Sequence, residues 1–349
     1  MNTKFKIYMK RIVTCLLVVC IAGMSSSCTF YANYSYEDED YKFLQKGSGI
    51  GVNNGVYTPS SSVYEDVTLS DEDTSLADAE TSQADTQALD SVSVYIDEIY
   101  DRFGIAVKVG ESVPTVFLDY VAEINTNTDD ILHALEVLED TFSLYPDDFF
   151  RQMCDGEYYD AIIVYLAGNL YPKDSTTHIS DASGFTIDDY SGISKVVFNI
   201  NDGLYMEPNL VVHEFTHVID YYFIGTGYWN EEAWNVLNPS GFSYAESYSG
   251  FTSIDTDYTS FSDEFINGIN DNVYFYSQYG KTFSLEDRAT LMEALLGYSV
   301  YNPDNYDRVF ECKHVIAKLD YYFDFIREVF DDSSWGEMTS WEKELEKYR

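Results

Sequence analysis

The sequence predicts an α+β fold, and three observations predict it. Helical and strand periodicities alternate over residues 92–200, which is typical of an α+β body. An apolar helical stretch, VVHEFTHVID, follows at 211–220. After residue 222 only helical patterns recur, separated by loops rich in Gly, Ser, Tyr and Asp. With 349 residues, 45% of them hydrophobic, the chain is long enough to bury a core.

Residues 1–27 predict a lipoprotein signal peptide that is no part of the fold. Four basic residues precede an apolar run at 12–24, which is too short for a comfortable transmembrane helix. Three serines then precede Cys28, which is expected to carry lipid and to anchor the protein at the bacterial cell envelope. Plain secretion is the alternative, because Ser25 stands where lipoproteins usually have an aliphatic residue.

Residues 28–91 predict a disordered acidic tether rich in Ser and Thr, because the segment has little periodic hydrophobicity. The whole chain has 60 acidic and 20 basic residues, a formal charge of −40. Such a chain is repelled by nucleic acid and by anionic lipid. We therefore expect a monomer with no nucleic-acid partner, whose contact with the membrane is through the lipid anchor alone.

The folded body is predicted to begin at residue 92 and to divide into a subdomain at 92–222 and a helical subdomain at 223–349. The expected helices and strands are, in order, a helix at 92–104, a strand at 105–109, a helix at 129–146 with Asp129 as a possible cap, strands at 160–168 and 194–201, the helix at 211–220, and helices at 285–297 and 314–330, followed by a charged tail at 340–349. Cys154 and Cys312 are expected either to pair or to stay separate thiols.

His213 and His217 are four residues apart, so on a helix both imidazoles point at one metal ion. Two histidines and one further protein ligand leave one position for water on a tetrahedral zinc ion, which is the pattern of a catalytic site. Glu214 lies about 100° round the helix, beside the water that the metal activates, where it can act as general base.

The spacing of this motif is fairly specific, and its context strengthens the metal hypothesis. Apolar residues occupy the rest of the helix, and buried His and Glu side chains among them are costly without a partner. Core histidines with other partners are the alternative. Asp220, three residues after His217, is either an acceptor for a ligand imidazole or an exposed residue at the helix end.

A third ligand has to come from further along the chain, because the sequence after His217 lacks another histidine at close spacing. Glu286 is favoured, because it lies near the start of an amphipathic helix in which the small Ala289 allows close helix packing. The other candidates are Glu231, Glu232, Glu246 and His314.

HEFTHVID followed by YGKTFSLEDRA resembles gluzincin zinc metallopeptidases, specifically secreted bacterial zinc-binding metallopeptidase lipoproteins, and more distantly the catalytic domain of anthrax lethal factor. ALEVLEDTFSLYPDDFF and RFGIAV also resemble that bacterial group, and the resemblance covers roughly residues 91–298. It implies a zincin-like fold with a mixed sheet and an active-site helix. It also implies that Glu286, followed by Ala289, is the third zinc ligand. Thr216 departs from the pattern, because many relatives have Gly there.

The same resemblance implies Tyr279, seven residues before Glu286, as a tyrosine that stabilises the transition state, with Tyr274 and Tyr276 as rivals. It also implies a peptide or protein substrate that binds along an edge strand, for which 194–201 is the candidate.

The predicted function is therefore that of a Zn²⁺-dependent metallopeptidase, a hydrolase with Glu214 as its base. The alternative is a catalytically silent zincin-fold surface lipoprotein that binds protein or glycan. The intact Glu214 favours the enzyme, because degenerate sites often lose the base first.

Overall fold

The computed structural model describes residues 91–156, 158–176, 182–189, 191–201, 206–248, 272–296 and 307–349. The predicted signal peptide, the lipidated Cys28 and the tether lie outside the described residues, apart from Ser91. Within the described ranges, no helix has the length and apolarity that crossing a membrane requires.

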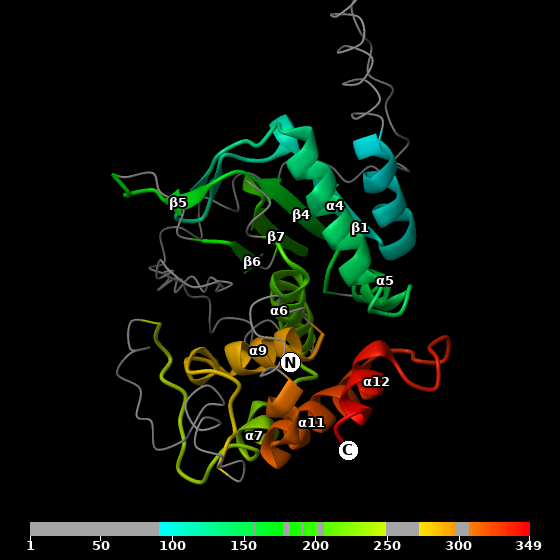
Figure 1. Ribbon diagram of the computed structural model, residues 1–349, viewed down its shortest axis with the longest axis vertical. Coiled ribbons are helices and arrows are strands. Elements are labelled where there is room, and N and C mark those ends of the chain that lie inside the picture. The colour runs from blue at the N-terminus through cyan, green and yellow to red at the C-terminus, as the bar shows by residue number, and fades with distance from the viewer. Residues whose placement is uncertain are drawn as a thin grey trace, which may run out of the picture.

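A four-stranded sheet forms the upper half of the molecule in Figure 1, with strand order β1-β4-β7-β6. β1 (Ile105–Lys108), β4 (Ala161–Ala167) and β7 (Ile193–Asn199) run parallel, and β6 (Gly184–Asp188) runs antiparallel to β7. The sheet is therefore mixed, and the predicted α+β class is confirmed.

The expectation that residues 194–201 form an edge strand is wrong. β7 pairs with β4 on one side and with β6 on the other, so its backbone groups are already used in the sheet. β6, which was not predicted from the sequence, follows β7 in the strand order and is the last strand of this sheet among the described residues. The five residues of β6 are all buried, and the apolar Phe185 and Ile187 alternate with the polar Thr186 and Asp188, so a short period-2 signal marks this strand and could have been read.

Helices cover this sheet. Residues 91–103 are helical, as predicted, and α4 (Thr128–Phe142) matches the predicted second helix. Its N-cap is Asn127, whose side chain accepts a hydrogen bond from the backbone N–H of Asp129, so the expected cap at Asp129 is wrong by two residues. α4 packs against the central helix through Phe142 and Phe215, whose ring centroids are 4.6 Å apart.

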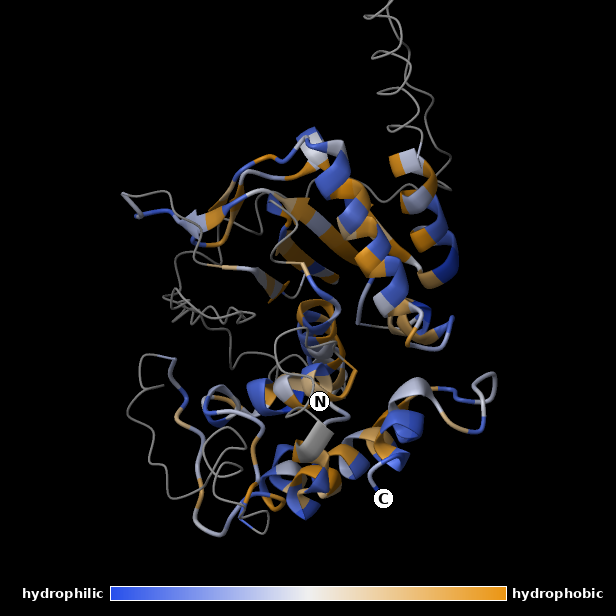
Figure 2. Ribbon diagram, viewed as in Figure 1, coloured by the Kyte–Doolittle hydropathy of each residue, from blue (hydrophilic) through white to orange (hydrophobic). Residues whose placement is uncertain are grey.

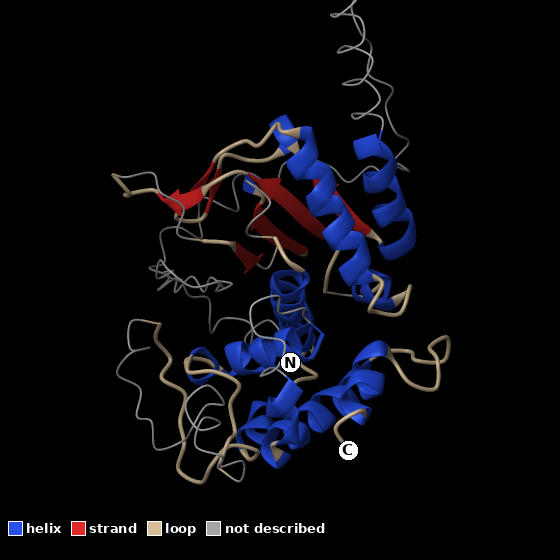
Figure 3. Ribbon diagram, viewed as in Figure 1, coloured by secondary structure: helices blue, strands red, loops and turns tan. Residues whose placement is uncertain are grey.

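The remaining elements of this half are short: η1 (Gly110–Ser112), α5 (Phe149–Cys154), and a small antiparallel sheet of β2 (Val116–Phe117), β3 (Tyr120–Ala122) and β5 (Leu170–Pro172). Among the described residues, strands are confined to this half, and the lower half contains helices and loops (Figure 3).

The central helix α6 (Pro208–Thr226) lies between the two halves (Figure 1). Pro208 occupies its first turn and Gly227, at φ 78°, ends it in the left-handed conformation that favours glycine. Its residues 210–220 are all buried, and in Figure 2 apolar residues alternate with a few hydrophilic ones along it. Close packing also requires Gly225, since a Cβ there would come within 1.9 Å of the Tyr158 ring.

The lower half is built from α7 (Glu231–Asn235), η4 (Tyr279–Lys281), α9 (Ser284–Leu296), η5 (Asp307–Glu311), α11 (Lys313–Val329) and α12 (Ser340–Glu346). The two predicted C-terminal helices correspond to α9 and α11, and α12 forms within the predicted charged tail. Cys154 and Cys312 are both free thiols, so the expectation of two separate thiols is confirmed and the expectation of a disulfide is wrong.

Candidate metal centre

His213 and His217 lie one turn apart on α6, with ring centroids separated by 4.9 Å. Both side chains are fully buried. Helical geometry places residues four apart on the same face, so α6 alone brings the two imidazoles together.

Glu286 reaches the same point from α9, a helix that packs closely against α6. Its Oε2 lies 3.1 Å from His213 Nε2 and 3.4 Å from His217 Nε2. The three candidate ligand atoms all lie within 4.8 Å of one another, and all three residues are buried. The structure thus brings together the three residues that the sequence nominated as metal ligands.

The chemistry of this cluster fits a zinc ion. Neither ring nitrogen of His217 has a hydrogen-bond partner among the described residues, although the ring is fully buried. Burial lowers the pKa of His217 to about 4, so its imidazole is neutral and has a lone pair to offer. Burial would raise the pKa of Glu286, but its interactions with the His217 and His213 rings, hydrogen bonds among them, hold that pKa well below its usual range. Two imidazoles and one carboxylate are a typical protein ligand set of a catalytic zinc ion.

Glu293, which the sequence reading missed, orients His213. The Nδ1–H of His213 donates to Glu293 Oε2 at 2.9 Å, which leaves Nε2 facing Glu286. Asn209 donates to the other oxygen of Glu293 at 3.3 Å. Against the effect of burial, the hydrogen bonds that His213 donates to the carboxylates of Glu286 and Glu293 raise the pKa of His213 to about 10, so the pocket around this ring attracts positive charge. The sequence contained a signal for Glu293, because this residue comes two helical turns after Glu286 and so lies on the same face of the helix.

Both expectations for Asp220 are wrong. It is buried, and it does not contact an imidazole. Its Oδ2 instead accepts from Arg288 Nε at 2.7 Å, and its Oδ1 accepts from the Tyr322 hydroxyl at 3.0 Å.

Glu214 projects beside the cluster, where Thr186 of β6 holds it. The Thr186 hydroxyl lies 2.8 Å from Glu214 Oε2 and 2.9 Å from the Glu214 backbone oxygen. The other carboxylate oxygen, Oε1, has no hydrogen-bond partner among the residues that the structure describes. Burial raises the pKa of Glu214 to about 8, which lets this carboxyl gain or lose a proton near neutral pH.

Two tyrosines flank the centre. The ring of Tyr279, in η4, lies 6.2 Å from the ring of His213. Tyr248, which the sequence reading missed, donates its hydroxyl to Glu286 Oε1 at 2.5 Å, and its ring lies 5.7 Å from that of Tyr279. Of the rivals, Tyr274 stacks on His314 at 3.8 Å and Tyr276 packs at the edge of the main core.

The other third-ligand candidates are placed elsewhere. Glu231 accepts from Trp229 Nε1 at 2.8 Å, and its side chain is 44% exposed. Glu232 lies in the first turn of α7, and the backbone of Glu246 is bonded to Thr282 at 2.8 Å. Over the described ranges, His213, His217 and Glu286 are the one group of His, Cys, Asp or Glu residues with metal-binding proximity.

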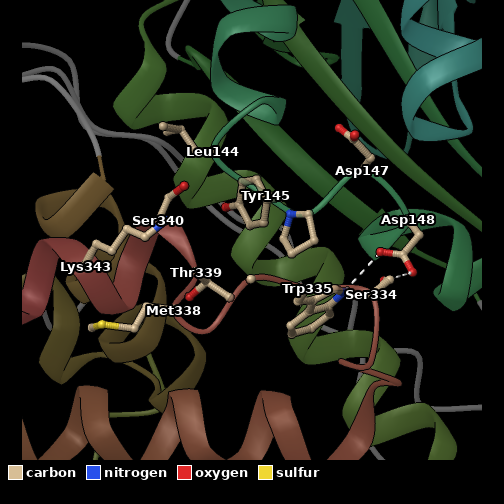
Figure 4. A pocket seen from close by; sticks show the side chains of 12 residues that line it. Leu144, Tyr145, Asp147, Asp148, Ser334, Trp335, Met338, Thr339, Ser340 and Lys343 are labelled. Atoms are coloured by element: carbon tan, nitrogen blue, oxygen red, sulfur yellow. Dashed lines mark hydrogen bonds between the residues drawn. The ribbon is translucent and has the colours of Figure 1, made fainter.

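A cavity of about 430 Å³ lies at a different place, between the turn that follows α4 and the segment at 334–343. Tyr145, Trp335 and Lys343 are among its lining residues (Figure 4). It contains none of the predicted site residues, so the candidate site is defined by the side-chain cluster and not by this cavity.

Comparison with known proteins gives limited similarity. No protein-family model matches the chain, and no curated protein matches it. One solved structure, described as a "putative zinc-binding metallo-peptidase" from Bacteroides caccae, is similar at 13% sequence identity and a TM-score of 0.44. The match covers 75% of this chain and 92% of that one. The functional argument therefore depends on the geometry of the cluster.

Proposed function

We propose that the protein is a zinc-dependent metallopeptidase in which His213, His217 and Glu286 hold the metal. The observation that carries this proposal is the convergence of Glu286 Oε2 on the Nε2 atoms of both histidines, at 3.1 and 3.4 Å. A bound zinc ion would lower the pKa of water and polarise the carbonyl group of a scissile peptide.

Glu214 is the proposed general base. Its Oε1 has no hydrogen-bond partner among the described residues, so this oxygen is available to a water molecule beside the cluster. Thr186 holds the other oxygen and fixes the direction of the carboxylate. With its pKa raised to about 8 by burial, Glu214 can accept a proton from the attacking water and return it to the leaving amine.

Tyr279 is proposed to stabilise the charge that develops on the substrate oxygen in the transition state. The support is the position of the Tyr279 ring beside the cluster, where its centroid lies 6.2 Å from the centroid of the His213 ring. Tyr248 has a different proposed role, because its hydroxyl is already bonded to Glu286 and so helps to hold the ligand carboxylate.

The test combines metal analysis with proteolysis. We expect about one zinc ion per chain in the purified protein, and hydrolysis of casein that a chelator abolishes and zinc restores. Glu214→Gln is expected to keep the zinc and lose on the order of 10²–10⁴-fold in hydrolysis, the usual contribution of a general base. Zinc binding without hydrolysis of any tested protein would favour the silent surface lipoprotein, and a folded chain that binds no zinc would exclude the metal site and the resemblance to zinc metallopeptidases.

The N-terminal sequence leads us to propose that the enzyme is anchored in the bacterial cell envelope through a lipid on Cys28. Lipid labelling and membrane fractionation of the wild type and Cys28→Ala test this. Unlabelled protein in the medium from both forms would show plain secretion instead.

A further inference from the structure

Three consecutive residues of α9, Glu286, Asp287 and Arg288, are ionisable and at most 1% exposed. Successive residues of a helix point about 100° apart, so three neighbours cannot share one partner. Burying a charge is costly unless it is paired. The first turn of α9 is therefore a place where the fold accommodates three charges, each in a different direction.

Each of the three contacts a different partner. Glu286 faces the two histidines of α6. Asp287 accepts from Lys318 Nζ of α11 at 2.6 Å and from the Tyr244 hydroxyl at 2.7 Å. Arg288 donates to Asp220 of α6 at 2.7 Å.

Aromatic rings and a further carboxylate also surround the guanidinium group of Arg288. Its Cζ lies 4.4 Å from the ring centroid of Trp229 and 5.3 Å from that of Trp234, both favourable positions for a cation near an aromatic ring. Glu231 lies 3.8 Å from its Nη1. An arginine with its planar group held in this way has little freedom to shift, and neither has the helix turn that carries it.

The Arg288–Asp220 pair joins α9 to α6 one helical turn beyond His217, so the same two helices meet at the ion pair and at the metal cluster. We propose that Arg288 and Asp220 are positioning residues, whose buried ion pair holds α9 at the distance from α6 at which Glu286 completes the metal site. This inference rests on the proposed metal site. The Asp287–Lys318 pair holds the other side of the same turn against α11.

Removing one member of such a pair leaves a buried unpaired charge and risks unfolding, whereas replacing both members by apolar residues is often tolerated. The test therefore uses the double variant Asp220→Leu/Arg288→Met in the full chain. Its matched control is Arg327→Met/Glu342→Gln, which removes an ion pair between α11 and α12. Circular dichroism establishes that each variant is folded.

Zinc affinity, measured by competition with a chromophoric chelator, is expected to fall at least ~10-fold in Asp220→Leu/Arg288→Met, the scale known for residues that support metal ligands. The control pair should keep the wild-type affinity. The visible spectrum of the Co²⁺-loaded protein is expected to change in the first variant only, because it reports the ligands around the ion.

If Asp220→Leu/Arg288→Met does not fold, the nearly isosteric Asp220→Asn decides, with the zinc-induced rise in Tm as the readout. A folded variant with wild-type zinc affinity and an unchanged Co²⁺ spectrum overturns the positioning role and leaves the metal site standing. A wild-type protein that binds no zinc overturns the proposed function itself.

Discussion

Helices α6 and α9 supply the candidate ligands of one metal centre, but they are stabilised in opposite ways. Most of the buried side chains of α6 around the histidines are apolar, and the two imidazoles need only the helix itself to share a face. On α9, the carboxylate of Glu286 sits beside two further buried charges, each paired with another element. The placement of the two histidines on α6 is thus local in origin, whereas the placement of Glu286 on α9 depends on the assembled tertiary structure.

The strongest test of this comparison is the loss of a ligand from either helix. Glu286→Ala and His217→Ala should both weaken zinc binding by more than the ~10–100-fold typical of an outer partner, because each removes a metal bond. Metal content after dialysis is the measurement. Glu231→Ala and Glu246→Ala are the matched controls, and zinc retained by Glu286→Ala would show that α9 supplies no ligand.

A smaller effect is expected at Glu293, which connects the two helices through His213. Glu293→Gln weakens the acceptor for Nδ1–H and should reduce zinc affinity by about 10–100-fold. Chelator competition measures it, with the exposed Glu328→Gln as control. Equal affinities in the two variants would mean that His213 is oriented by α6 alone.

Thr186→Val, which preserves side-chain shape, is expected to act on the base and not on the metal. The hydrogen bond from Thr186 lowers the pKa of Glu214, so its loss raises that pKa further. Because the base must be ionised, the acidic limb of the rate profile should move to higher pH, with kcat about 10-fold lower at neutral pH. Zinc content should not change, and an unmoved acidic limb would contradict the role of Thr186.

The smallest effect on the site is expected from Gly225→Ala, near the end of α6. A Cβ would collide with the Tyr158 ring, so the free energy of unfolding should fall by about 1–3 kcal/mol. Urea denaturation measures it, and Gly336→Ala, where the nearest atom is 3.5 Å away, is the control. Zinc affinity of the folded protein should stay at the wild-type value, because the histidines lie two or more turns earlier.

Much of the site was readable along the chain, and what was missed has a physical reason. His213, Glu214 and His217 were predicted because their chemistry follows from helical spacing, and Glu286 because its sequence has a helical pattern with a small residue one turn on. Their roles as ligands and base stay predictions. Thr186 was missed because it comes from β6, a short strand whose apolar–polar alternation covers only residues 185–188. Asp220 was misassigned because its partner, Arg288, is 68 residues away.

The sequence by itself determined the α+β class, the long helices and the two imidazoles on one helical face, since these depend on residues within a few turns of one another. Tertiary structure alone decided the strand order that puts β7 inside the sheet, and it decided which carboxylates meet the histidines. Strand pairing and buried ion pairs join segments tens of residues apart, and their energy depends on burial and partner geometry that no local pattern records. The candidate metal centre combines the two, because a local motif on α6 supplies its histidines and the rest of the fold holds the carboxylate of Glu286 beside them.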